Sequence, residues 1–305
     1  MKFTKPALTI DDQVDLLFAR GMTGHRERML RRLRHVNYYR LSAYWHTFRA
    51  PGSESFLDGT DFEEVWGRYV FDRQLRLLVM NALERVEVSL RARLACEHAT
   101  RFGPFGYACD PKTIFEHDSF KRAEFFQRLD KDLTQSGREP FLQHFKEKYG
   151  DQHDRPPVWV AAEVLSFGGL VSMFRGSPNA VQKEVAKDFG APAVVFESWL
   201  LVLNAVRNVC AHHGRLWNRT LGLQPKFPRI DVNKDWHTPV SVGKDKAFGT
   251  LTILAHCLGV TSPGTQWAHR LASLLDSHPN IPKRYLGIPE NWRECPIWAR
   301  LLANE

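Results

Sequence analysis

The sequence lacks the short motifs that mark the commonest nucleotide-dependent and hydrolytic enzymes. It has no G-x-x-x-x-G-K-[ST], no G-x-G-x-x-G, no H-E-x-x-H and no G-x-S-x-G. Those patterns bring backbone amides to a phosphate, two histidines to a zinc ion, or a serine to an exposed turn. Their absence argues against a nucleotide-dependent motor, a zinc protease or a serine hydrolase.

Cysteine is scarce, and its spacing argues against a disulfide framework. The five residues are scattered, odd in number and free of any C-x-x-C pair: Cys96, Cys109, Cys210, Cys257 and Cys295. That usage fits a reducing compartment. The Cys-x-His pairs that end at His98 and His212 match none of the usual zinc-ligand spacings. We therefore expect neither a metal ion nor a cofactor.

Long hydrophobic runs are missing as well. No apolar run approaches the roughly 20 residues that span a bilayer, and residues 1–6 lack the apolar stretch of a signal peptide. The 305 residues are 43% hydrophobic and 25% charged, which is the composition of a globular protein. These features predict a cytoplasmic protein without a membrane partner.

Positive charge is concentrated near the N-terminus. The whole chain has a formal net charge of +8, yet its first 50 residues hold ten Lys or Arg against four Asp or Glu. Aromatic residues, among them Tyr38, Tyr39 and Trp45, are interleaved with these arginines. The segment either contacts a phosphate backbone and unstacked bases, or forms a solvated helix face over a buried aromatic stripe. For Tyr38 and Tyr39 we expect packing rather than base stacking.

Helical signals dominate the chain and predict an all-α, multi-helix bundle. Residues 9–12 read as a capping box that opens a first helix, which Gly21 ends. Gly168-Gly169 is expected to permit a close helix crossing or a kink. Alternating β patterns are scarce, residues 221–245 read as a long connection, and residues 287–292 read as a loop. The other predicted helices cover residues 25–34, 40–49, 62–100, 119–134, 140–149, 158–169, 179–189, 194–213, 247–259 and 265–277.

The densest polar cluster follows an apolar helix. Residues 199–206 are mostly apolar, and Arg207, Asn208 and His212 come directly after them. Burying such groups is costly unless they are paired or functional. In an ideal helix Arg207 and His212 differ by about 7.5 Å of rise and about 140° of rotation, whereas Asn208 and His212 share a face.

This cluster suits metal-independent RNA cleavage, in which the ribose 2′-OH attacks its own adjacent phosphate. A histidine such as His212 can accept the proton near neutral pH. A guanidinium such as Arg207 can neutralise charge on the phosphoryl oxygens, and Asn208 can orient the imidazole or the phosphate. The alternative is a structural network that caps a buried helix end. The bare spacing of Arg and His recurs often in this chain, so it does not decide between the two.

Several stretches in order resemble the Abi-like (AbiD/AbiF-type) abortive infection proteins of bacteria. They include N-Y-Y-R-L-S-A-Y-W at residues 37–45 and R-N-V-C-A-H-H-G-R-L-W-N at residues 207–218. The other matching stretches are residues 13–21, 71–76, 84–91, 157–159, 163–168 and 287–289, with Trp292. That family looks like a branch of the HEPN superfamily, whose R-N-x-x-x-H signature is met by Arg207, Asn208 and His212.

The resemblance implies an RNase-type site without metal, with His213 and Arg215 in supporting roles. It also implies phage defence or a toxin–antitoxin system, with a structured non-coding RNA as a partner of some members. The implied organisation is a basic N-terminal region (residues 1–60), a HEPN-like helical core (61–220) and a C-terminal helical extension packed on that core (221–305). Given the resemblance, the basic residues expected to face RNA are Arg28, Arg31, Arg32, Arg34 and Arg40.

HEPN sites pair two motifs, and this chain has one strong copy. Either a homodimer brings two Arg207/His212 motifs together, which we expect because two-fold pairing of one patch is the commonest route to a composite site, or Arg93 and His98 supply a degenerate second half. The sequence therefore leaves two alternative functions open. One is a dimeric endoribonuclease, and the other is a non-catalytic protein that holds a cognate structured RNA on its basic N-terminal region.

Overall fold

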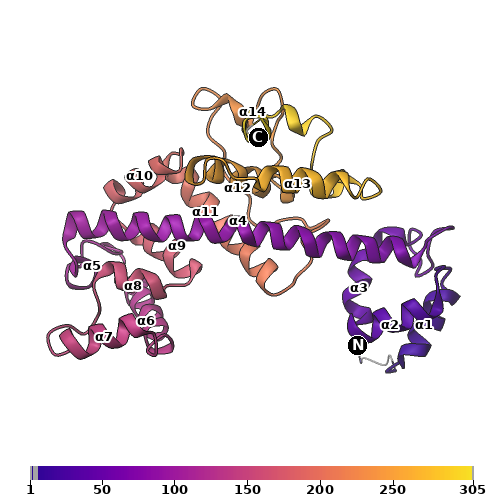
Figure 1. Cartoon of the computed structure of the whole chain (residues 1–305), viewed down its shortest axis with the longest axis horizontal. Helices are drawn as coiled ribbons and strands as arrows, with labels where there is room; N and C mark the ends of the chain where they lie inside the picture. Colours follow the sequence, from indigo (N-terminus) through magenta and orange to yellow (C-terminus); the bar gives the residue numbers. More distant parts are fainter. Residues whose placement is uncertain (1, 3–5, 304–305) are drawn as a thin grey trace. The chain divides into compact units, whose positions relative to one another are not determined.

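A computed structural model describes residues 2 and 6–303, and within them the regular structure is helical (Figure 1). No strand forms in this part of the chain, where pairing is limited to two isolated bridges, Thr23 with Asp61 and Arg49 with Phe56. The all-α prediction is confirmed. The expectation about a signal peptide concerns residues 1–6, of which 1 and 3–5 lie outside the described residues.

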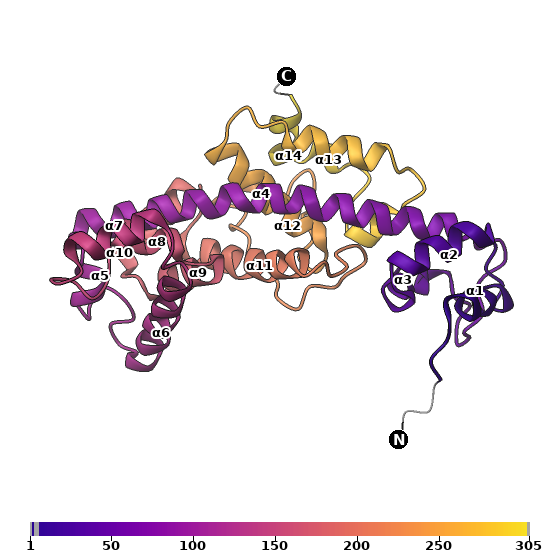
Figure 2. The same cartoon turned by 60° about the horizontal axis from the view of Figure 1, so that its bottom comes forward.

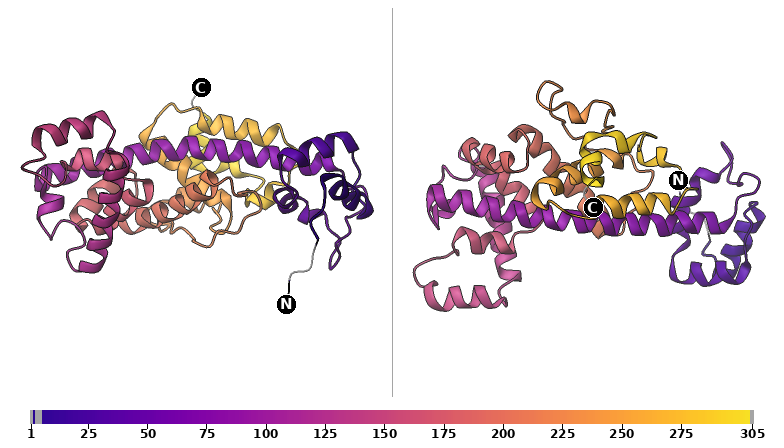
Figure 3. Two further views of the ribbon diagram at one scale, coloured as in Figure 1. Left: turned by 90° about the horizontal axis from the view of Figure 1, so that it is seen from below. Right: turned by 45° about the horizontal axis from the view of Figure 1, so that its top comes forward.

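Contacts divide the chain into two compact units, which are described separately. One holds the residues up to Leu75 together with His278–Ile281, and the other holds Arg76–Ser277 and the residues from Pro282 onward. The long helix α4 (Phe62–Phe102) belongs to both and is continuous (Figure 3). The division therefore falls inside α4, whereas the sequence suggested boundaries at residues 60 and 220.

The first unit consists of α1 (Ile10–Ala19), α2 (Arg26–His35), α3 (Tyr38–Trp45) and the first turns of α4. The predicted capping box is confirmed, because the Thr9 and Asp12 side chains each accept a hydrogen bond from the other's backbone N–H. Gly21 follows α1 with a φ of 91°, a conformation that favours glycine. In the interior, the Tyr44 hydroxyl donates to Asp72 over 2.6 Å.

The second unit is built from α5 to α14 around the rest of α4. Helices α13 and α14 lie on one side of α4 and α6 on the other (Figures 1 and 2). Its α-helices are α5 (Gly106–Cys109), α6 (Ser119–Gln135), α7 (Pro140–Tyr149), α8 (Val158–Val164), α9 (Phe167–Gly176), α10 (Asn179–Asp188), α11 (Ala193–Ala211), α12 (Ala247–Thr261), α13 (Trp267–Asp276) and α14 (Pro296–Leu302).

The helix predicted over residues 40–49 begins earlier, as α3, and ends as a 3-10 turn over His46–Phe48, and α5 was not predicted. Two further differences lie in the second unit. The helix expected over residues 158–169 is split, because Leu165 is extended and the Ser166 hydroxyl caps α9 by accepting from the Gly169 N–H. The tail beyond residue 287 also contains helix α14, which begins with Pro296 at its first turn. The close crossing or kink expected at Gly168-Gly169 stays a prediction, because a Cβ placed on Gly168 would lie 3.5 Å from the Asn204 side chain of α11, an ordinary van der Waals distance.

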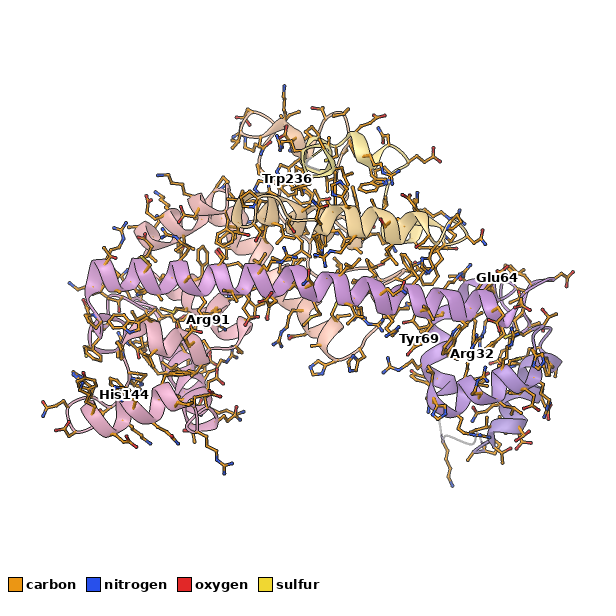
Figure 4. The ribbon with its side chains drawn as sticks, in the orientation of Figure 1. Arg32, Glu64, Tyr69, Arg91, His144 and Trp236 are labelled. Carbon is orange, nitrogen blue, oxygen red and sulfur yellow. The ribbon has the colours of Figure 1, made fainter. Side chains whose placement is uncertain are left out.

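Helix α11 lies in the core of this unit. Its Phe196, Trp199 and Leu203 side chains are fully buried, and α11 contacts α9, α10 and α12. Trp199 packs against Trp236, labelled in Figure 4, with ring centroids 5.1 Å apart. With 19 residues and a mean hydropathy of 1.4, α11 is long and apolar enough to span a membrane by length and composition alone. The expectation that no run approaches that length is therefore wrong, and 39% of this apolar window is buried within the structure.

Candidate functional site

The polar cluster lies at the exposed C-terminal end of α11. Val206 and Cys210 face the core, 1% and 4% exposed, so the intervening positions turn outward. Arg207 is half-buried, Asn208 is exposed, and the Arg207 guanidinium donates to the Asn208 Oδ1 over 3.5 Å. A helix whose apolar stripe is buried thus presents a guanidinium and an amide on its outer face.

His212 is the residue that ends this helix. Its φ and ψ are −87° and 15°, and its backbone N–H donates to the Asn208 carbonyl over 3.0 Å. The side chain is exposed, and no hydrogen bond to the imidazole exists within the described residues. A structural network at a buried helix end needs burial, which Asn208 and His212 do not have. Their exposure leaves both groups accessible to a ligand.

The turn after His212 is strained. His213 adopts a left-handed φ of 56°, its N–H donates to the Cys210 carbonyl, and the Gly214 N–H donates to the Val209 carbonyl over 2.7 Å. This is a Schellman turn with histidine at the position that glycine usually occupies. The left-handed conformation costs about 1–2 kcal/mol for a residue with a Cβ. The helix therefore ends at Ala211, two residues before the predicted stop.

The two supporting residues and a small groove complete this surface. His213 is exposed, Arg215 is half-buried, and both have interaction partners in the chain. A groove of about 180 Å³ follows α11 between Val202 and Val209 and is closed on its other side by residues 219–223. Its lining is largely apolar, with Arg219 at its edge. The polar cluster at the end of α11 therefore borders a small groove, and few polar side chains line that groove.

Arg93 and His98 occupy a different environment within α4. His98 is fully buried, its Nε2 lies 2.8 Å from the Ser177 hydroxyl, and burial lowers the pKa of its imidazole to about 4. Arg93 forms ion pairs with Glu97, over 3.1 Å, and with Asp188. A neutral, enclosed imidazole is poorly placed to exchange protons with a bound ligand.

The basic residues of the N-terminal unit fall into two groups. Arg32 is 18% exposed, pairs with Glu63 over 2.7 Å and lies 4.5 Å from the Trp66 ring, so it fastens α2 to α4 (Figure 4). Arg28 lies 3.8 Å from the same carboxylate. Arg31 and Arg34 are exposed and have no ion pair in the described part of the chain, and Arg40 is exposed as well.

The two adjacent tyrosines behave differently. Tyr38 packs edge-on against Trp45, with ring centroids 4.8 Å apart, and its hydroxyl accepts from Arg20. Tyr39 is 85% exposed. The packing prediction is confirmed for Tyr38 and wrong for Tyr39, because the first turn of α3 directs position 39 to solvent. An exposed aromatic ring therefore lies beside Arg40.

No group of three His, Cys, Asp or Glu side chains suited to a metal ion occurs among the described residues. The two Cys-x-His pairs show why their members do not converge. Cys96 is exposed while His98 is buried, and Cys210 is buried while His212 is exposed. Residues two apart in a helix point in nearly opposite directions.

Comparisons with known proteins identify the family. Neither a curated protein nor a solved structure matches the chain. A family model described as Abi-like protein matches residues 31–218, which include the second half of α2, all of α3 to α11 and the whole cluster at Arg207, Asn208 and His212. Because the match covers more than half of the sequence, the chain belongs to the Abi-like protein family.

Proposed function

We propose that this Abi-like protein is a metal-independent endoribonuclease of the HEPN superfamily, of the AbiD/AbiF type. It acts in the cytoplasm, in phage defence by abortive infection or as the toxin of a toxin–antitoxin system. Family membership supports the defence role. The observation that carries the enzymatic part is the exposure of Asn208 and His212, with Arg207 beside them, at the end of an otherwise buried helix.

The proposed reaction uses three side chains. The His212 imidazole accepts the proton of a ribose 2′-OH, and that oxygen attacks the adjacent phosphorus. The bond from phosphorus to the 5′ oxygen breaks, and this oxygen leaves with a proton. The products are a 2′,3′-cyclic phosphate and a 5′-hydroxyl end. Arg207 neutralises the charge that develops on the phosphoryl oxygens, and Asn208 holds the phosphate or the imidazole in place.

One imidazole cannot both accept and donate a proton in a single step, so the proposed site contains a second motif. A two-fold homodimer places a second copy of the α11 end opposite the first. Each His212 then accepts or donates according to its position relative to the bound RNA. The expected observation is a dimer in light scattering that persists in the preparation that cleaves RNA. A fully active monomer contradicts this arrangement.

The test of the nuclease is cleavage of RNA in the presence of EDTA. We expect a cyclic phosphate at the new 3′ end, and we expect Arg207→Ala and His212→Ala to abolish cleavage while circular dichroism remains unchanged. His144→Ala and Arg138→Ala are the matched controls, because both side chains are exposed elsewhere in the same unit (His144 is labelled in Figure 4). Equal cleavage by the site variants and the controls rejects the assignment.

A second candidate function rests on the N-terminal unit. Exposed Arg31 and Arg34, with the 85% exposed ring of Tyr39, suit a phosphate backbone and a stacked base. We propose on this basis that the unit holds a structured non-coding RNA, either without catalysis or as a restraint on the nuclease.

The RNA-holding candidate has its own test. It predicts that the native preparation carries nucleic acid, seen in its 260/280 nm absorbance ratio, and that sequencing identifies one structured RNA. Replacing Arg31 and Arg34 by alanine should release this RNA and reduce the salt dependence of its rebinding. The Arg138→Ala variant should retain it. A preparation free of RNA, with no salt-sensitive affinity, contradicts the candidate.

A further inference from the structure

A groove of about 730 Å³ lies between α6 and α9 in the second unit. It is separate from the Arg207 cluster and was not predicted from the sequence. Lys121, Arg128 and Lys131 line it from one face of α6, with the exposed carboxylate of Glu124 between the first two, and Arg175 lines it from the end of α9. The spacing of seven and then three residues puts the α6 cations in a row that extends for about 15 Å along the helix.

Two of these cations lack a partner in the described part of the chain, and two are paired. Lys121 pairs with Asp118 over 2.7 Å, and Arg175 pairs with Glu197 over 2.9 Å. Arg128 and Lys131 are exposed, and neither has a hydrogen bond or ion pair within the described residues. A row of cations, some of them uncompensated, suits a chain of negative charges better than a single phosphate.

The groove also offers an acceptor and an aromatic ring. The Oδ2 atom of Asp132 is buried in its wall and has no hydrogen-bond partner in the described structure. A buried acceptor without a donor is costly, so a ligand that reaches Asp132 must bring a donor, such as a hydroxyl, beside its phosphates. Phe115 lines the groove with a left-handed φ of 50°, which is strained for a bulky residue.

Phe115 is fixed in this conformation by Gly176. Its N–H donates to the Gly176 carbonyl over 2.7 Å, and a Cβ at position 176 would lie 2.6 Å from its ring. The glycine therefore makes room for the ring at the edge of the groove. A half-buried ring held there can stack against a base, an interaction that every base can make.

The groove borders the helix that carries the candidate catalytic residues. Helix α9 lies between α6 and α11 (Figure 2) and contacts both. A Cβ on Gly168 of α9 would lie 3.8 Å from the Arg128 guanidinium and 3.5 Å from Asn204. Asn204 is one turn before Asn208, on the same face of α11. The cationic row thus approaches the polar face that ends at Arg207 and Asn208.

We propose that the α6–α9 groove holds the phosphate backbone of single-stranded RNA and directs the strand toward the end of α11. The inference rests on the proposed nuclease and names where its substrate binds. Cations in a row bind consecutive phosphates, Asp132 accepts from a 2′-hydroxyl, and Phe115 stacks on a base. An acidic peptide would also satisfy the cations, but it has no regular repeat of a phosphate, a hydroxyl and a base.

The test measures binding separately from cleavage. Every chain in the binding assay carries His212→Ala, so that RNA stays intact, and the probe is a short unstructured RNA labelled with fluorescein. We expect the additional changes Arg128→Ala and Lys131→Ala to weaken binding about tenfold or more. They should also lower the slope of log affinity against log salt by about 0.7 for each phosphate that the variant no longer neutralises. The matched control, Lys183→Ala with Lys187→Ala on α10, should leave both quantities unchanged.

A second arm tests the kind of nucleic acid. DNA of the same sequence should bind about threefold to tenfold more weakly than RNA, the worth of one hydrogen bond, and Asp132→Ala should remove that difference. Equal affinity for DNA and RNA in the parent chain contradicts the choice of RNA. Unchanged RNA binding in the Arg128/Lys131 variant rejects the proposal that the α6–α9 groove binds RNA.

Failure of the groove and failure of the nuclease look different. If the Arg128/Lys131 variant binds RNA normally while Arg207→Ala still abolishes cleavage, the proposal that the groove binds RNA is rejected and the proposed nuclease activity is retained. If RNA binding depends on the groove but no chain cleaves RNA in EDTA, the proposed nuclease activity is rejected and the RNA-binding groove is retained.

Discussion

Two segments of the second unit share the same spacing of residue types but have opposite environments. Residues 93–98 of α4 and residues 207–212 at the end of α11 both read R-x-x-C-x-H. In α4 the cysteine is exposed and the histidine is fully buried, whereas in α11 the cysteine is 4% exposed and the histidine faces solvent. The comparison shows that spacing alone does not make a site.

The difference follows from helix phase. Each residue turns a helix by about 100°, so cysteine and histidine two positions apart always point to nearly opposite sides. The apolar neighbours decide which of them faces the core. Leu90 and Leu94 direct the His98 side of α4 inward, while Leu203 and Val206 direct the Cys210 side of α11 inward. Identical spacing therefore yields a packed imidazole in one helix and an accessible one in the other.

The largest expected effect is the difference in RNA cleavage between variants of Arg207 and Arg93. Arg207→Ala should reduce RNA cleavage by about a hundredfold or more, the usual range for losing one group that stabilises transition-state charge. Arg93→Ala should leave the cleavage rate within about twofold, the change that about 0.5 kcal/mol produces, because Glu97 and Asp188 already pair with its guanidinium. Cleavage rates in EDTA at saturating RNA make the comparison. Equal losses in the two variants favour a second half-site at Arg93 and His98.

Part of this architecture is predictable from local sequence, and the reasons are specific. The capping box at Thr9 and the proline-free, nearly glycine-free run of α4 are encoded within a few residues of each other. The break between α8 and α9 was missed, because Leu165 and Ser166 lie inside an apolar run that hides the cap. Helix α14 was missed because it is short and follows a segment rich in turn residues.

The candidate site was predictable only in part. The polar residues that follow the apolar face of α11 pointed to Arg207, Asn208 and His212. The burial of His98 depends on Ser177, which is 79 residues away, and no local pattern reveals it. Nothing in the sequence around α6 singles out its cations. They form a groove only because α9 packs beside them and contributes Arg175.

The second expected effect concerns stability. His98→Ala should lower the free energy of unfolding by about 2–4 kcal/mol, because it leaves a cavity and removes a buried hydrogen bond. His212→Ala should change it by less than about 0.5 kcal/mol, as is usual for exposed positions. Urea unfolding of the two variants beside the parent chain measures both values. Similar losses in the two variants indicate that His212 is also part of the packed core.

The pH dependence of stability sharpens the same contrast. Burial lowers the pKa of His98 to about 4 from its ordinary 6.5, so between these values the unfolded chain binds a proton that the folded chain does not. The contribution of the neutral His98 imidazole to the free energy of unfolding is therefore fully present above about pH 6.5. It is lost as the pH falls toward 4, by up to about 3 kcal/mol. Urea unfolding across this range should show a shallower loss in His98→Gln, which keeps a polar group but does not titrate.

His256 provides the control for that measurement. Burial also lowers the pKa of its imidazole, so some pH dependence should remain when His98 is replaced. If His98→Gln and the parent lose equal stability between pH 6.5 and 4, the imidazole of His98 is not buried in its neutral form.

The smallest expected effect concerns the two cysteines, whose modification tests helix phase directly. In the native chain iodoacetamide should alkylate exposed Cys96, while Cys210 should react only after unfolding. Peptide mass spectrometry after brief treatment, with and without urea, distinguishes the two thiols. Because Cys96 lies on the outer side of α4, its alkylation should shift the urea midpoint very little. Native labelling of Cys210 would mean that the end of α11 opens readily, and the exposure of His212 would then reflect fraying rather than a built site.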